Sequence, residues 1–220
     1  MNDELFAAQR RESSGPRLET TPAIVDPSAF SSQLTAALDA GDVAAVLLRF
    51  AGTDERTRIN CAKALSIPVQ GKGAALLLDG HVELVARAGA DGAHATGLAA
   101  LREAIEQLKP ERIAGTGGLV TRHDAMLAAE QGADYVMFGD PDVEGRRPAL
   151  PAIEERVAWW AEVFEIPCVG YAASLGDIAP LVAAGADFIA LGDFLWRDSD
   201  RIASTMSEVS GYLKLPEPTA

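Results

Sequence analysis

Eight short apolar runs, each separated from the next by a turn and an amphipathic stretch rich in alanine and leucine, dominate this sequence. The runs cover residues 23–26, 44–50, 74–79, 92–95, 112–116, 135–139, 168–171 and 188–192. Their cores are almost uniformly apolar, which is typical of parallel strands buried on both faces. The intervening segments place apolar residues at helical spacing, for example Leu98, Leu101, Ala104, Ile105 and Leu108. This order predicts eight strand–helix units in an α/β fold.

A short repeat supports the count of eight. Ala-Gly-Asp or Gly-Ala-Asp precedes every second run, at residues 40–42, 89–91, 132–134 and 185–187. The glycine can adopt the left-handed conformation that ends a helix, and the aspartate then begins the turn into the next strand. Recurrence before every second strand indicates a closed barrel with an even number of strands. We therefore predict a single (β/α)8 TIM barrel, with an open doubly wound sheet as the alternative.

The length of 220 residues suits one barrel, since single barrels contain about 250 residues and at least about 200. Residues 1–20 have no sustained hydrophobic period, and we expect them to form a flexible leader. The barrel then covers residues 21–214, and the proline-rich residues 215–220 form a frayed tail.

The composition limits which binding partners and which cellular location we expect for this protein. A formal net charge of −13 would repel a polyanion, so we expect no nucleic acid partner. Cys61 and Cys168 lie in different expected elements, which favours two buried thiols in a reducing cytosol over a disulfide or a zinc site. No apolar run approaches the roughly 18 residues that span a membrane, and residues 1–20 lack the apolar segment of a signal peptide. We predict a cytoplasmic protein that binds neither membranes nor nucleic acids.

Active sites of TIM barrels lie at the carboxyl ends of the strands, where this chain has several charged residues. Four aspartates end or follow expected strands: Asp26, Asp79, Asp140 and Asp193. Their mutual repulsion requires compensating groups, and three arginines are available: Arg49, Arg146 and Arg147. We predict a site for a polar small molecule, with Asp26 and Asp79 as possible magnesium ligands. Alternatively, each aspartate only caps the helix that follows it or accepts hydrogen bonds in a turn.

Further candidates lie on the fourth, fifth and seventh strands. His94 is either a proton carrier or a core histidine bonded to a backbone carbonyl. Thr116 and Gly117 end the fifth strand, where the glycine pair at 117–118 would let the backbone approach a phosphate. Tyr171 ends the seventh strand and could stack on a cationic ring.

With the strands placed, the order of motifs resembles the thiamine phosphate synthase and thiazole tautomerase family from about Ala23 to Trp196. The segments that carry the resemblance are 25–26, 47–49, 78–85, 89–94, 132–139 and 184–190, of which Gly-Ala-Asp-Tyr-Val-Met-Phe-Gly at 132–139 is the most specific. The resemblance implies a TIM barrel that joins hydroxymethylpyrimidine pyrophosphate to a thiazole phosphate and releases pyrophosphate. Magnesium and basic residues would stabilise the leaving group.

The resemblance also implies roles for individual residues. Arg49 matches the family arginine, Asp79 the first magnesium ligand and His94 the histidine of the fourth strand. Other positions differ from the family pattern. Leu47, Ala51 and Leu78 stand where the family has glutamine, lysine and asparagine, and residues 98–100 contain no carboxylate to serve as the second metal ligand. Ala172-Ala173 replaces the family's glycine pair, and Gly192 replaces its serine. Arg146 and Arg147 would replace the family's pyrophosphate-binding loop, beside Asp140.

Thiamine phosphate synthesis is therefore the activity that we predict, with pyrimidine and thiazole phosphates as small-molecule substrates. The first alternative is an isomerase similar to the thiazole tautomerase, with His94 or Asp193 as the proton carrier. The second is a non-catalytic binder of thiamine or its precursors, because an acidic mouth suits a cationic ring. A homodimer is the expected assembly for a barrel of this type.

Overall fold

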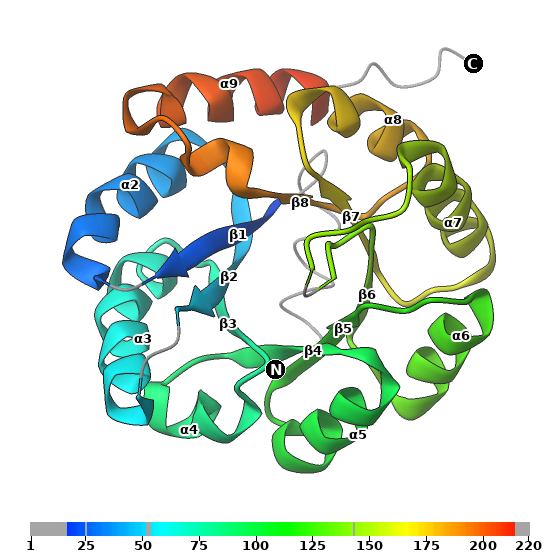
Figure 1. Cartoon of the computed structure of the whole chain (residues 1–220), viewed down its shortest axis with the longest axis horizontal. Helices are drawn as coiled ribbons and strands as arrows, with labels where there is room; N and C mark the ends of the chain where they lie inside the picture. Colours follow the sequence, from blue (N-terminus) through cyan, green and yellow to red (C-terminus); the bar gives the residue numbers. More distant parts are fainter. Residues whose placement is uncertain (1–16, 25, 52–53, 143, 214–220) are drawn as a thin grey trace.

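Eight parallel strands close into a barrel that is surrounded by helices (Figure 1). The strands pair in chain order, and β8 closes the sheet by pairing with β1. This computed structural model describes residues 17–24, 26–51, 54–142 and 144–213. The predicted TIM barrel is confirmed, and the open sheet is excluded.

The eight strands are β1 (Arg17–Ile24), β2 (Val43–Phe50), β3 (Ala75–Asp79), β4 (Gly92–Thr96), β5 (Ile113–Gly117), β6 (Tyr135–Phe138), β7 (Cys168–Ala172) and β8 (Phe188–Leu191). The α-helices of the described residues are α2 (Pro27–Ala40), α3 (Glu55–Gln70), α4 (Val85–Ala88), α5 (Gly97–Leu108), α6 (Arg122–Gln131), α7 (Leu150–Val163), α8 (Ile178–Ala183) and α9 (Ile202–Leu213). Short 3-10 turns are η1 (Val82–Leu84), η2 (Leu175–Asp177), η3 (Asp193–Trp196) and η4 (Ser199–Arg201). From β2 to β8, each observed strand end lies within one residue of its prediction.

The first strand differs from the prediction. β1 begins at Arg17, inside the range 1–20 that we expected to be a leader, and it ends before Asp26. Its polar sequence hid it from a search for apolar runs, whereas its stability comes from pairing with β2 on one side and β8 on the other. Asp26 is the N-cap of α2 and accepts a hydrogen bond from the Ser28 amide at 2.9 Å. The rest of the expected leader, 1–16, and the expected tail lie outside the described residues.

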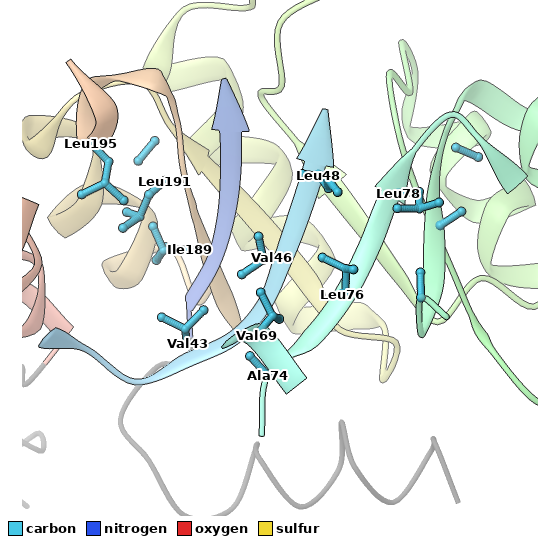
Figure 2. Packing of buried hydrophobic residues seen from close by; sticks show 14 of the residues in the cluster. Val43, Val46, Leu48, Val69, Ala74, Leu76, Leu78, Ile189, Leu191 and Leu195 are labelled. Atoms are coloured by element: carbon cyan, nitrogen blue, oxygen red, sulfur yellow. The ribbon is translucent and has the colours of Figure 1, made fainter. Parts of the chain in front are cut away.

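Two apolar clusters hold the barrel together. The outer cluster lies between strands and helices, and Figure 2 shows Val46 and Leu48 of β2 beside Leu76 and Leu78 of β3. The inner cluster fills the barrel with large side chains that include Leu47, Leu77, Tyr135, Met137, Tyr171 and Phe188. Because both faces of the strands are buried, polar side chains are concentrated at the strand ends.

The repeated Gly-Ala-Asp segments join neighbouring strands at the amino end of the barrel. In three copies the carboxylate accepts a hydrogen bond from an amide near the start of the preceding strand: Asp91 from Leu76 at 2.8 Å, Asp134 from Ala114 at 2.7 Å and Asp187 from Cys168 at 2.9 Å. The amide of each aspartate donates back to the carbonyl of the same partner residue. The glycines of these copies have φ values of 72°, 96° and 94°, as the helix-ending role requires. The copy at 40–42 differs, because Gly41 has an extended φ of −152°.

We expect Asp134→Ala to lower the free energy of unfolding by about 1–3 kcal/mol, because it leaves the buried Ala114 amide without its acceptor. The substitution also removes the ion pair with Lys109. Asp42→Ala is the matched control, since Asp42 holds the same place in the repeat but is exposed, and its effect should stay within about 0.5 kcal/mol. Urea denaturation measures both changes. Equal midpoints for Asp134→Ala and the native protein would contradict this role of the repeat.

Candidate active site

Charged side chains meet at the carboxyl ends of β2 and β3. Arg49 directly follows the Leu48–Leu78 pair in register, which places it beside Asp79 at the end of β3. Its Nε donates to Asp79 Oδ2 at 3.1 Å, and its Nη1 lies 3.8 Å from Asp193 Oδ1 at the start of η3. One guanidinium therefore offsets the repulsion between two carboxylates at the mouth of the barrel.

His94 lies beside this group, since it pairs in register with Asp79. The imidazole is buried, and its Nδ1 is 2.9 Å from the hydroxyl of Tyr135 on β6. Burial lowers the pKa of His94, although the charges of Asp79 and Asp140 oppose this change. Burial also raises the pKa of Tyr135 well above its ordinary value. At neutral pH the pair therefore consists of an uncharged imidazole and a protonated phenol, and the partner of His94 is this hydroxyl rather than a backbone carbonyl.

Asp140 directs its carboxyl group toward the end of β5. Its Oδ2 accepts a hydrogen bond from the Gly118 amide at 3.0 Å. A Cβ atom at Gly117 would lie 2.6 Å from this oxygen and 2.8 Å from His94 Nε2, so glycine is needed to accommodate both groups. Burial raises the pKa of Asp140, against the opposing effects of His94 and of the hydrogen bond from Gly118.

A pocket of about 480 Å³ opens between the loops that follow β5 and β6. This volume is within the range of small-molecule sites. Its apolar lining comes mainly from Leu119, Val120, Met137, Phe138, Pro141 and Pro148. Its charged lining residues are Asp140, Asp142, Arg146, Arg147 and Arg156. Asp140 therefore connects the pocket to the His94 side of the barrel mouth.

Arg146 and Arg147 have different environments. Arg147 is largely buried, and its Nη1 pairs with Asp177 at 2.7 Å while its Nη2 donates to the Tyr171 carbonyl at 3.1 Å. Arg146 is exposed and pairs with Asp142 and Glu144 of its own loop at 3.0 Å and 2.8 Å. Arg147 thus braces the loop after β6 against the end of β7, whereas Arg146 can turn toward a ligand.

Other predicted residues do not join the group at the mouth. Asp26 is exposed and caps α2. Thr116 is fully buried, and its hydroxyl donates to the Ala95 carbonyl at 3.1 Å. Tyr171 lies in the inner cluster, where its hydroxyl occupies the space that a Cβ at Gly192 would need. Tyr135 is the residue that sequence reasoning missed, although its position in the most specific family segment was a signal.

Magnesium fits these residues poorly. Among the residues that the structure describes, no group of three or more histidine, cysteine, aspartate or glutamate side chains could hold a metal ion. The predicted ligand Asp79 pairs with Arg49, and Asp26 is used as a cap. The prediction of a magnesium site on Asp26 and Asp79 is therefore not supported by the arrangement of these side chains.

Comparisons with known proteins agree with one another. A family profile described as thiamine monophosphate synthase matches residues 20–194. The chain is 36% identical over 197 residues to a thiamine-phosphate synthase of Rhodospirillum centenum, covering 88% of this chain and 95% of that protein. It is 34% identical over 206 residues to a thiamine-phosphate synthase of Hyphomonas neptunium, covering 90% and 93%. The thiamine phosphate pyrophosphorylase of Pyrococcus furiosus has the same fold, with a TM-score of 0.74, 18% identity and coverage of 92% and 98%.

The environment of His94 predicts the direction of its titration. We expect the pKa of His94 in native protein to lie below the ordinary value of about 6.5, because burial dominates. Asp79→Asn should lower this pKa further by removing a negative charge, and Arg49→Gln should raise it by removing a positive one. The measurement is an NMR titration of the imidazole signals, assigned with His94→Gln. A pKa of His94 above 6.5 in native protein would contradict the effect of burial.

Proposed function

Because this chain belongs to the thiamine monophosphate synthase family, we propose that it joins hydroxymethylpyrimidine pyrophosphate to a thiazole phosphate and thereby forms thiamine phosphate. The observation that carries this proposal is the Arg49–Asp79 ion pair at the barrel mouth. Both residues occupy positions that match family residues, and the pocket beside Asp140 has the volume of a small-molecule site.

The proposed reaction breaks the bond between the pyrimidine methylene carbon and the pyrophosphate oxygen. Pyrophosphate leaves with the bonding electrons, and the thiazole nitrogen donates its electron pair to form the new carbon–nitrogen bond. Negative charge grows on the leaving group, where the guanidinium of Arg49 and the exposed guanidinium of Arg146 would stabilise it. Positive charge grows on the two rings, where Asp79 and Asp193 supply a negative field.

The family resemblance implies magnesium, with Asp79 at the position of the first ligand, whereas in this structure Asp79 is paired with Arg49. When bound, such an ion would neutralise pyrophosphate charge. The described residues do not form a cage for the ion, so we assign it no step. The proposed roles of Arg49 and Arg146 depend on the charges of their own side chains.

We also propose a cytoplasmic location and a homodimer. No helix among the described residues is long and apolar enough to cross a membrane, and both cysteines are free and buried. Burial, together with the charge of Asp26, raises the pKa of Cys61 to about 11, so this thiol is poorly reactive.

Trp160 is fully buried, which leaves the partly exposed Trp159 for the subunit contact of the proposed homodimer. Sedimentation equilibrium of the purified protein tests the dimer.

We expect purified protein to form thiamine phosphate from the two substrates with magnesium present. Arg49→Met should lower kcat/KM roughly 10- to 150-fold, because a charge-assisted hydrogen bond contributes about 1.5–3 kcal/mol. Arg102→Met on the exposed face of α5 is the control and should keep native activity. Folded native protein that makes no product at high concentration would refute the synthase and favour the isomerase or the ligand binder.

The two arginines after β6 should respond differently to substitution. Arg146→Ala should raise the KM of the pyrophosphate substrate several-fold with an unchanged free energy of unfolding, because its side chain is exposed. Arg147→Ala should lower the free energy of unfolding by about 1–3 kcal/mol, because it removes the ion pair with Asp177 and the hydrogen bond to the Tyr171 carbonyl. Steady-state kinetics and urea denaturation separate the two effects. Native stability of Arg147→Ala combined with a raised KM would instead make Arg147 a ligand for pyrophosphate.

A further inference from the structure

The carboxyl group of Asp140 differs from the other carboxylates at the barrel mouth. Asp79 pairs with Arg49, Asp142 with Arg146 and Asp177 with Arg147. Among the described residues, Asp140 forms no ion pair, and its carboxyl group accepts hydrogen bonds from backbone amides, those of Gly118 and of Asp140 itself. The side chain of Asp140 is partly buried and lines the pocket.

We propose that Asp140 is a specificity-determining residue, whose carboxyl group binds the edge of an aminopyrimidine ring where the amine adjoins a ring nitrogen. This inference rests on the proposed function, since that reaction uses a pyrimidine carrying an amine. It assigns Asp140 to the ring rather than to the phosphate groups of the substrate.

The surroundings of Asp140 favour a flat and uncharged ligand part. Leu119, Met137 and Phe138 contribute apolar surface to the same pocket. A phosphate group beside Asp140 would meet a carboxyl group, with a further negative charge on Asp79. An aromatic ring would bury its faces against the apolar lining instead.

The chemistry of a carboxyl group matches that of an aminopyrimidine edge. In its protonated form the group donates its O–H to a ring nitrogen and accepts from the amine, so two hydrogen bonds form in one plane. Burial raises the pKa of Asp140, which favours the form that can donate. In its ionised form the carboxylate still accepts from the amine, in a charge-assisted hydrogen bond.

The charges around the pocket also set the orientation of the substrate. The exposed Arg146 lies on the loop after β6 and lines the same pocket as Asp140. A substrate with its ring at Asp140 would therefore extend its pyrophosphate toward the solvent-exposed guanidinium. The reverse orientation would place an anion at the partly buried carboxyl group of Asp140, at a cost in desolvation and repulsion.

Calorimetric titration with 4-amino-5-hydroxymethyl-2-methylpyrimidine, which lacks pyrophosphate, tests this assignment on the full-length protein. We expect Asp140→Leu to weaken binding of this pyrimidine at least tenfold. Asp140→Asn should weaken it less, because an amide keeps one donor and one acceptor. Asp42→Asn, an exposed carboxylate at the amino end of the barrel, is the control and should bind with native affinity.

Folding of each variant is checked by circular dichroism. If Asp140→Leu fails to fold, native protein is titrated with 5-hydroxymethyl-2-methylpyrimidine, which has no amine. The proposal requires at least a tenfold loss of affinity for this analogue, and equal binding of the two pyrimidines overturns it. Asp140→Leu that binds the aminopyrimidine within threefold of native protein also overturns it, as does native protein without measurable binding.

The activity assay separates this inference from the proposed function. Pyrimidine binding that depends on Asp140, in native protein that makes no thiamine phosphate, would refute the function and support the assignment. Normal thiamine phosphate formation by Asp140→Leu, with an unchanged KM for the pyrimidine substrate, would refute the assignment and leave the function standing.

Discussion

Closure of the sheet by the pairing of β8 with β1 buries both faces of the strands and dictates where charge can lie. A charged group inside such a barrel would lose its hydration without compensation, so charged side chains are stable only near the strand ends. Arg49 and Asp79 occupy the ends of β2 and β3, where one side chain neutralises the other. The polar groups that lie deeper, His94 and Tyr135, are neutral and partner each other.

Two glycines on β5 make this inner arrangement possible. A Cβ at Gly115 would lie 2.0 Å from the Tyr135 ring, and a Cβ at Gly117 would approach both Asp140 and His94. The absence of a side chain at Gly115 and at Gly117 thus gives space to Tyr135, His94 and Asp140. The arrangement couples the pocket to the charged pair, because Asp140 contacts the loop of β5 on one side and faces His94 on the other.

The eight apolar runs predicted most of the fold, because burial on both faces leaves a strong apolar signal in β2 to β8. The prediction for the first strand, residues 23–26, missed most of β1. The polar residues of β1 are held by pairing with β2 and β8, which a local sequence pattern does not reveal. The end-of-strand rule correctly placed Arg49, Asp79 and Asp140 at the carboxyl ends of the strands. It could not separate Arg147 from Arg146, because the partner of Arg147 is Asp177, thirty residues away in sequence. It also could not show that Thr116 turns its hydroxyl to the Ala95 carbonyl.

The partners of the arginines bear on how an anionic substrate could enter. Arg147 and Arg156 are committed to the protein, the first to Asp177 and the second to the carbonyls of Leu119 and Val120. Arg49 pairs with carboxylates at the barrel mouth, and the exposed Arg146 pairs with Asp142 and Glu144 of its own loop. Exposed ion pairs such as those of Arg146 contribute little to stability. Exchanging such a carboxylate for pyrophosphate therefore costs little free energy. The same exchange releases carboxylates from their arginines, close to the pyrimidine and thiazole rings that become positively charged in the proposed reaction. The arginine would then stabilise the departing pyrophosphate, and the released carboxylate would stabilise the cation.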